Sequence, residues 1–285
     1  MREAGPPRFA AEWLELREPA DAAARASGLL HPLRAALPAP DGASGPLVIR
    51  DLGCGTGSMG RWLAPRLLGP QHWILHDHDP ALLARAAATF PAAAADGSTV
   101  TAATERGDLA DLTATGLAGT GLVTASALLD LLTHDEVAGL AGACAEAGAP
   151  ALLALSVAGR VELTPHDPLD AEITAAFNDH QRRTDGGRRL LGPDAAAVAT
   201  AAFERHGARV ITRSGPWRLG APDAALAAAW LRGWVGAACE QRPELGPRVQ
   251  PYLRRRLAAC GAGELSVTVH HTDLLALPRP RPRAD

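Results

Sequence analysis

Residues 47–57 read Leu-Val-Ile-Arg-Asp-Leu-Gly-Cys-Gly-Thr-Gly, an apolar run that ends in three alternating glycines. The run predicts a buried strand at 47–52. The glycines predict a sharp turn into a helix near 57–68, because the backbone turns there without a Cβ in the way. Such a helix offers free N–H groups at its start, and a nucleotide cofactor is the usual occupant of the crevice beside it. A tight turn that holds no ligand is the alternative interpretation.

Short apolar strands and helices alternate on the C-terminal side of this segment. Further strands are predicted near 72–77, 98–103, 121–125 and 151–157, with later ones at 208–213 and 265–272. The predicted helices fall near 80–89, 133–147 and 193–206, and the first of these begins at Pro80 with Asp79 as its N-cap. This alternation predicts an α/β fold with a doubly wound, mostly parallel seven-stranded sheet.

Several segments extend this minimal pattern. Residues 9–37 predict two helices that join at Pro19, since proline suits the first turn of a helix. We therefore expect an N-terminal helical cap and linker over 1–45, a cofactor-binding domain over 46–278 with insertions at 158–191 and 223–260, and a disordered tail over 279–285. The second insertion predicts two helices, and both insertions are candidates for the wall of the substrate site.

Composition excludes several classes of function. The sequence contains no lysine, so all 28 of its strongly basic residues are arginine. A Walker-type phosphate loop and a Schiff-base enzyme both need a lysine. The net charge of −3 gives no electrostatic reason to expect nucleic acid or a membrane surface as a partner. No apolar run is long enough to cross a bilayer, and the first residues lack the apolar core of a signal peptide, so we expect a cytoplasmic protein.

The glycine spacing distinguishes between cofactors. A dinucleotide fingerprint needs its third glycine at position 58, where this chain has Ser58. An acid, Asp77, ends the next predicted strand and is placed to accept hydrogen bonds from two ribose hydroxyls. It lies 26 residues after Asp51, and the turn at 69–71 accounts for a distance longer than the usual value of about 20 residues.

The stretch from Asp51 to Gly57 resembles the first motif of the class I S-adenosylmethionine (SAM)-dependent methyltransferases. The similarity continues through 74–80, through Arg106-Gly107-Asp108-Leu109 and through 122–131, so it spans residues 47 to 157 in the expected order. It implies a Rossmann-like methyltransferase fold, SAM as the cofactor and transfer of a methyl group to an O, N or C nucleophile. Size and charge favour a small-molecule acceptor, with a place in specialised metabolism as one option.

The resemblance implies a set of residues for each role. The cofactor would be held by Arg17, Asp51, Gly53, Cys54, Gly55, Gly57, Asp77, His78, Asp108, Leu109 and Ser126. In this set Asp108 would accept the adenine amino group, and Arg17, on the N-terminal helix, would pair with the methionine carboxylate. An ordinary surface ion pair with Asp21, four residues on, is an equal alternative for Arg17. The candidates for a base or an acceptor-orienting group are Asp130, His166 and His180.

Other interpretations stay open at this level. The histidines and acids at 72–79 do not predict a metal site, because neighbouring strand residues point to opposite faces. An NAD(P)-dependent oxidoreductase is one rival function, although Ser58 and the single tyrosine, Tyr252, count against it. A non-catalytic SAM-binding module that acts through a protein partner is another. A homodimer is left open.

Overall fold

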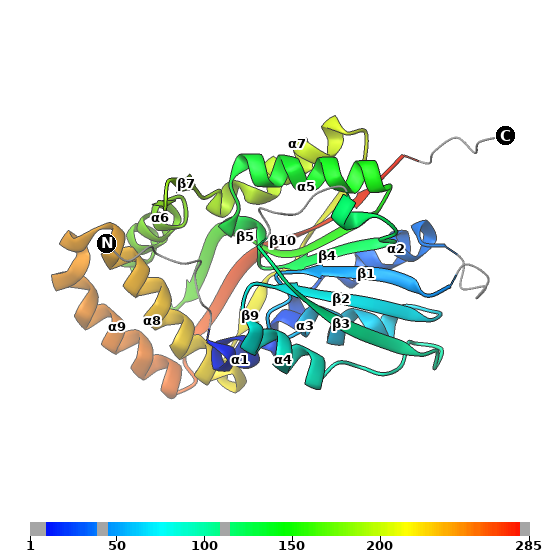
Figure 1. Cartoon of the computed structure of the whole chain (residues 1–285). Helices are drawn as coiled ribbons and strands as arrows, with labels where there is room; N and C mark the ends of the chain where they lie inside the picture. The colour runs from blue at the N-terminus through cyan, green and yellow to red at the C-terminus, as the bar shows by residue number, and fades with distance from the viewer. Residues whose placement is uncertain (1–9, 39–44, 109–114, 280–285) are drawn as a thin grey trace.

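The computed structural model describes residues 10–38, 45–108 and 115–279. Within them, one mixed sheet of eight strands forms the centre of the molecule (Figure 1). Seven strands follow the order β3-β2-β1-β4-β5-β10-β8, and the eighth, β9, pairs with β10. Their bounds are β1 Leu47–Leu52, β2 Gln71–Asp77, β3 Val100–Arg106, β4 Leu122–Ser126, β5 Ala151–Thr164, β8 Arg209–Ser214, β9 Trp217–Leu219 and β10 Ser266–Leu277.

The sheet is parallel from β3 to β5 and antiparallel only around β10. β1 pairs in parallel with both β2 and β4, and the parallel pairing continues to β3 on one side and to β5 on the other. β10 runs antiparallel to β5, β8 and β9. The predicted doubly wound, mostly parallel sheet is therefore confirmed, with the short strand β9 as an addition.

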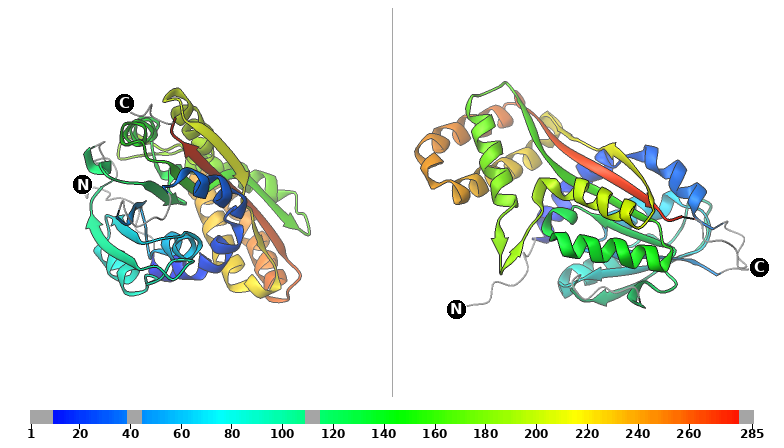
Figure 2. Two further views of the ribbon diagram at one scale, coloured as in Figure 1. Left: turned by 90° about the vertical axis from the view of Figure 1, so that its right-hand side faces the viewer. Right: turned by 90° about the horizontal axis from the view of Figure 1, so that it is seen from above.

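Helices cover both faces of the sheet. Their bounds are α1 Ala11–Ala24, α2 Leu30–Ala36, α3 Ser58–Leu63, α4 Pro80–Ala88, α5 His134–Ala147, α6 Leu169–Gln181, α7 Ala195–Arg205, α8 Ala224–Gln241 and α9 Gly246–Gly261. α5 and α7 pack on one face, and α2, α3 and α4 lie on the other (Figures 1 and 2).

Alternation along each strand creates a separate apolar core on each face. On β5, Leu152 and Ala154 belong to the core under α3, whereas Leu153 belongs to the core under α5 and α7. Successive strand residues point to opposite faces, so a parallel sheet that is buried on both sides needs apolar residues at nearly every position. This requirement explains the continuous apolar runs in the sequence.

The inserted segments build a helical layer at one end of the sheet. α6 packs on α8, and α8 packs on α9, where the first insertion also extends β5 to Thr164. A buried network ties this layer together: Arg256 donates to both carboxylate oxygens of Asp170 at 2.7 and 2.8 Å, and the Tyr252 hydroxyl donates to the same carboxylate at 2.6 Å. The two helices predicted over 223–260 are confirmed by α8 and α9.

The prediction of a helix break at Pro19 is wrong. α1 continues through Pro19 and ends at Ala24. Proline removes one backbone donor from a helix interior, but contacts with other elements on both sides of Pro19 compensate for this loss. Glu18 is paired with Arg61, and Asp21 is buried against Trp217. Tertiary contacts therefore override the local signal.

Candidate functional site

A crevice lies where β1, β2, β3 and β4 reach their carboxyl ends. Each strand contributes the residues that follow it: the glycine loop after β1, Asp77 and His78 from β2, Asp108 after β3 and Ser126 from β4. Ligands bind in this position in open α/β sheets, because the crossovers leave a gap between neighbouring loops there. Helix α1 adds Leu14, Arg17 and Asp21 to the wall on the other side.

The glycine loop has a backbone that other residues would strain. Gly53, Gly55 and Gly57 have φ values of 58°, 55° and 86°, all in the left-handed region. A Cβ on Gly53 would lie 2.9 Å from the Leu128 side chain, and one on Gly55 would lie 3.1 Å from Leu14. The alternating glycines therefore let the loop pass close to both walls of the crevice.

Asp77 organises the loop and the end of β2. One carboxylate oxygen accepts a hydrogen bond from the Gly55 N–H at 2.9 Å, and the other accepts one from the Asp79 N–H at 3.0 Å. Asp79 in turn caps α4 by accepting from the Ala81 N–H at 2.8 Å, as its position before Pro80 predicted. Asp77 is only 6% exposed, yet it lines the crevice. Asp77 therefore presents a largely buried carboxylate at the crevice.

Asp51 is a fully buried carboxylate beneath the glycine loop. Its Oδ1 atom accepts a hydrogen bond from the Thr124 hydroxyl at 2.7 Å, and its Oδ2 atom has no hydrogen-bond partner among the described residues. Burial raises the pKa of Asp51 to about 7, against the opposing effects of the Thr124 hydrogen bond and the nearby Arg25 cation. A buried oxygen without a partner is costly, so a donor supplied by a ligand would stabilise this site.

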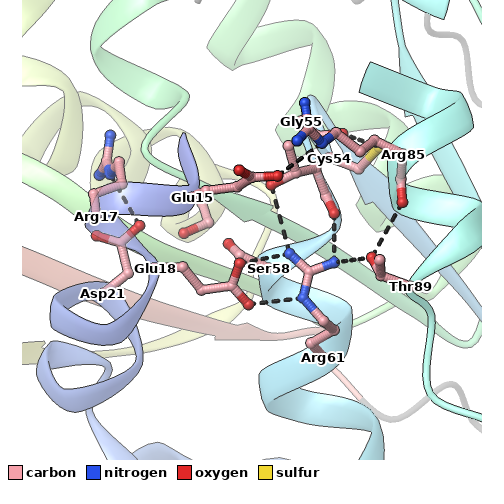
Figure 3. Close-up of polar contacts among 12 residues, drawn as sticks. Glu15, Arg17, Glu18, Asp21, Cys54, Gly55, Ser58, Arg61, Arg85 and Thr89 are labelled. Atoms are coloured by element: carbon pink, nitrogen blue, oxygen red, sulfur yellow. Dashed lines mark hydrogen bonds and ion pairs between the residues drawn. The ribbon is translucent and has the colours of Figure 1, made fainter. Parts of the chain in front are cut away.

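Helix α1 is held over the glycine loop by ion pairs. Arg61 donates to both carboxylate oxygens of Glu18 at 2.7 and 2.6 Å and to the Thr56 carbonyl at 2.5 Å (Figure 3). Arg85 pairs with Glu15 at 2.7 Å on the same side of the helix. Each arginine comes from a helix that follows a strand of the parallel sheet. Helix α1, which contributes one wall of the crevice, is thus held by ion pairs to α3 and α4, the helices that follow β1 and β2.

Arg17 forms the ion pair with Asp21 that was one of its two alternatives, although the pair is largely buried instead of lying on the surface. Its Nε atom donates to Asp21 at 2.9 Å, an ion pair four residues apart, and its guanidinium lies 5.0 Å above the centre of the Trp217 ring. The Asp21 carboxylate is buried and also accepts from the Trp217 indole N–H at 2.9 Å. Arg17 nevertheless lines the crevice, so this network fixes the position of a cation at the site.

Arg25 is a site residue that the sequence did not reveal. It follows α1, is only 4% exposed, and donates to the hydroxyls of Ser58 and Ser126 at 2.9 and 3.2 Å. Burial lowers the pKa of its guanidinium, and Asp21 and Asp51 offset part of that effect. Arg25 therefore links the start of α3 to the end of β4 underneath the crevice. Its partners lie 33 and 101 residues away in the chain, so no local pattern indicates it.

The structure gathers most of the residues predicted for the cofactor, but not those predicted for catalysis. Nine line the crevice: Arg17, Asp51, Gly53, Cys54, Gly55, Asp77, His78, Asp108 and Ser126. Gly57 lies behind the loop as the N-cap residue of α3, and Leu109 lies outside the described residues.

None of the three candidates for a base is among the residues that line the crevice. Asp130 is beside the crevice in the short turn at Leu129–Leu131 but does not line it, and burial raises the pKa of its carboxyl. His166 is exposed at 3.5 Å from Asp170, and His180 lies 3.1 Å from Glu240. The structure therefore does not bring His166 or His180 to the crevice, because they belong to the helical layer around α6.

The two insertions contribute few residues to the crevice, although we expected both to be candidates for the wall of the substrate site. Of residues 158–191 only Arg188 lines the crevice, and of residues 223–260 none does. α8 and α9 instead bury their apolar faces against α6 and each other. In the described ranges, no group of three or more histidine, cysteine, aspartate or glutamate residues is placed to hold a metal ion, and no helix is long and apolar enough to span a membrane.

Comparison with known proteins gives structural neighbours only. No protein-family model and no curated protein matches the chain. It is similar to a SAM-dependent methyltransferase from Thiobacillus denitrificans in complex with S-adenosyl-L-homocysteine, at 15% identity over 94% of this chain and 99% of that chain, with a TM-score of 0.44. It is also similar to the cyclopropane synthase MmaA2 from Mycobacterium tuberculosis (14% identity, 87% and 83% covered, TM-score 0.43). A third neighbour is the YcgJ protein from Bacillus subtilis (13% identity, 89% and 98% covered, TM-score 0.46).

All three TM-scores lie below 0.5, so the assignment of the fold rests on the strand order. The parallel order β3-β2-β1-β4-β5 is the order of a doubly wound Rossmann-like sheet, and the antiparallel β10 lies between β5 and β8. The chain therefore has a Rossmann-like, doubly wound α/β fold.

Proposed function

We propose that this protein is a SAM-dependent methyltransferase that acts on a small molecule. The observation that carries the proposal is one crevice in which the glycine loop after β1, Asp77 at the end of β2 and Asp108 after β3 meet. The three features come from separate parts of the sequence, and each matches a different part of an adenosine-containing cofactor.

The residues present fit SAM. The loop after β1 lines the crevice at Gly53 and Gly55, where a side chain would press on Leu128 or Leu14 and distort the wall. Asp77 would accept hydrogen bonds from the ribose hydroxyls and Asp108 from the adenine amino group. Arg17 would pair with the methionine carboxylate, because it presents a fixed cation at the same crevice. The buried Oδ2 of Asp51 is an acceptor whose donor the described residues do not supply.

When bound, the cofactor supplies an activated methyl group on a sulfonium sulfur. The protein then has to position the acceptor, exclude water and receive a proton where the acceptor loses one. Ser126 lines the crevice at the end of β4, and Arg25 fixes its hydroxyl from below. Among the residues predicted for a base, we retain Asp130, whose buried carboxyl adjoins Leu131 on the crevice wall.

A small-molecule acceptor is consistent with the position of α1 over the crevice. α1 lies over the glycine loop and is tied down by Arg61 and Arg85, so a large folded or nucleic-acid substrate has little direct access from that side. The net charge of −3 also gives no attraction to a polyanion. We infer a compact O, N or C nucleophile.

Methyl transfer is tested by incubating the full chain with SAM labelled in its methyl group and with panels of phenols, amines and carboxylic acids. A product that carries the label and is heavier by one methylene supports the proposal. If the protein binds SAM but methylates nothing across broad panels and cell extracts, while a protein partner binds only the SAM-loaded form, it is a SAM-binding module instead. If NAD(P) is bound and SAM is not, the proposal fails.

A further inference from the structure

A buried carboxylate of β10 joins two segments that lead to the crevice. Asp273 is 1% exposed and does not itself line the crevice. Its Oδ1 atom accepts a hydrogen bond from the Leu155 N–H of β5, and its Oδ2 atom accepts one from the Ala26 N–H just after α1, both at 2.7 Å. One side chain therefore connects segments that lie 118 and 247 residues away from it in the chain.

The contact with β5 is made at a β-bulge. The register between β5 and β10 shifts there, so that Ala154 and Leu155 together lie opposite Asp273. Leu155 is fully buried and has a φ value of 57°, in the left-handed region where a side chain strains the backbone. The Asp273 carboxylate stabilises this conformation, because it accepts from a buried N–H that the disrupted ladder leaves without a backbone partner.

The bulge is adjacent to the end of β4, where the crevice wall begins. Ala154 lies opposite Ser126 in the parallel pairing of β4 with β5, and its carbonyl accepts from the Ala127 N–H at 2.9 Å. Ala127 lines the crevice and has a φ value of 51°. In the described part of the chain, Ala127 and Leu155 are the two residues other than glycine with positive φ. Such strain persists only where surrounding contacts enforce it, so the shape of this wall depends on the bulge.

The second hydrogen bond of Asp273 fixes the chain after α1. Ala26 follows Arg25, whose guanidinium donates to the Ser126 hydroxyl at 3.2 Å. Gly215 permits this close approach, since a Cβ there would lie 2.7 Å from a carbonyl at the end of α1 and 3.2 Å from Asp273 Oδ1. Asp273 therefore acts on the end of β4 from two directions, through the bulge and through Arg25.

We infer that Asp273 is a positioning residue for the methionine end of the cofactor, an inference that rests on the proposed function. Ser126 ends β4 and Ala127 follows it, whereas the proposed adenine acceptor Asp108 follows β3. β1 and β2 separate these two strands in the sheet, so the contacts of Asp273 act on the side of the crevice away from Asp108. Arg17, which would pair with the methionine carboxylate, belongs to α1, and Asp273 holds the chain directly after that helix.

Calorimetry with SAM, S-adenosylhomocysteine and 5′-methylthioadenosine tests this role in the wild type and in Asp273→Asn. The third probe has the adenosine part of the cofactor but lacks its amino-acid part. Asparagine keeps the shape and one acceptor oxygen, but its NH2 group faces a backbone N–H, so one of the two hydrogen bonds is lost. We expect SAM and S-adenosylhomocysteine to bind about 5- to 10-fold more weakly, and 5′-methylthioadenosine to stay within about 2-fold of the wild type.

Tyr252→Phe is the matched control for a general loss of stability. It also removes one hydrogen bond to a buried carboxylate, that of Asp170, but it does so in the helical layer and not at the crevice. Both variants should unfold at a lower urea concentration than the wild type, since each loses a buried hydrogen bond. Only Asp273→Asn should change the affinity for SAM, so reduced stability alone would not explain that change.

A second pair of variants keeps the carboxylate and covers the case in which Asp273→Asn does not fold. Gly215→Ala would press on Asp273 and on the end of α1, whereas at Gly233 a Cβ meets nothing within 4 Å. Gly215→Ala should therefore weaken SAM more than 5′-methylthioadenosine, and Gly233→Ala should weaken neither.

Unchanged SAM affinity in the folded Asp273 or Gly215 variant, or equal losses for SAM and 5′-methylthioadenosine, would overturn the inference and leave the proposed function intact. If the wild type binds none of the three probes, the proposed function itself fails.

Discussion

The substitution Asp51→Asn tests whether the buried carboxylate beneath the glycine loop lowers the free energy of unfolding at neutral pH. Asp51 is fully buried, its Oδ2 atom lacks a hydrogen-bond partner among the described residues, and burial raises its pKa from 3.8 to about 7. Asparagine has nearly the same shape and can still accept the Thr124 hydroxyl, but it carries no charge. The variant therefore removes the cost of an ionised carboxylate at this position.

The magnitude follows from linkage between proton binding and folding. The folded state holds the Asp51 proton more tightly than the unfolded chain, so this group's contribution to the free energy of unfolding is full below about pH 4 and is lost as the pH rises through 7. Each pKa unit corresponds to about 1.4 kcal/mol, and the loss between pH 5 and pH 8 is about 2–3 kcal/mol. Asp51→Asn does not suffer this loss. Its stability relative to the wild type should rise by that amount across the interval.

Urea unfolding of both proteins without cofactor, at several pH values from 5 to 8, measures this difference. An unsatisfied amide in the variant would shift the whole curve by a constant of about 1–3 kcal/mol, so the slope with pH is the informative quantity. The control is Asp135→Asn, at an exposed position in the first turn of α5, whose difference should vary by less than about 0.5 kcal/mol. If the difference in free energy of unfolding between Asp51→Asn and the wild type did not change with pH, the buried carboxylate would not destabilise the protein at neutral pH.

Two further substitutions test the contact between α1 and Trp217 and the proposed ribose site at Asp77. Trp217→Phe should lower the free energy of unfolding by about 1–3 kcal/mol, because it leaves buried Asp21 without its indole donor. Trp234→Phe is the control, since the buried Trp234 indole N–H has no hydrogen-bond partner in the described residues. Equal losses for the two variants in urea unfolding would show that the Trp217–Asp21 hydrogen bond does not stabilise the protein. Asp77→Ala should weaken SAM binding about 10- to 100-fold, as expected for charge-assisted hydrogen bonds to the ribose. Calorimetry measures this loss, and unchanged affinity would remove Asp77 from the site.

The sheet and the cofactor wall were predictable because both depend on local patterns. Apolar runs placed β1 and β2 within one residue of their observed bounds, and β5 at its observed start. The glycine loop and the acids that follow neighbouring strands then had to meet at one edge, since the carboxyl ends of parallel strands share it. This geometry explains why eight of the nine predicted cofactor residues in the crevice lie together, and the ninth, Arg17, comes from α1.

The rest depends on contacts between distant segments. Arg25 reaches Ser126, 101 residues away, and Asp21 meets Trp217, 196 residues away. The contact between Asp21 and Trp217 also stabilises α1 beyond Pro19, where the local pattern predicted a break. In the first insertion, His166 and His180 lie beside the carboxylates of Asp170 and Glu240 and do not line the crevice. The residue of that segment that reaches the crevice, Arg188, lies in a stretch whose charge pattern resembles an ordinary solvated surface.

The crevice under α1 is proposed to hold SAM. Whether it does is measured by calorimetric titration of the purified chain with SAM, S-adenosylhomocysteine and NAD(P). We expect SAM and S-adenosylhomocysteine to bind saturably to one site per chain, with affinity that Asp77→Ala weakens, and we expect no binding of NAD(P). Binding of NAD(P) in the absence of SAM binding, or SAM binding that is indifferent to Asp77→Ala, would contradict this proposal.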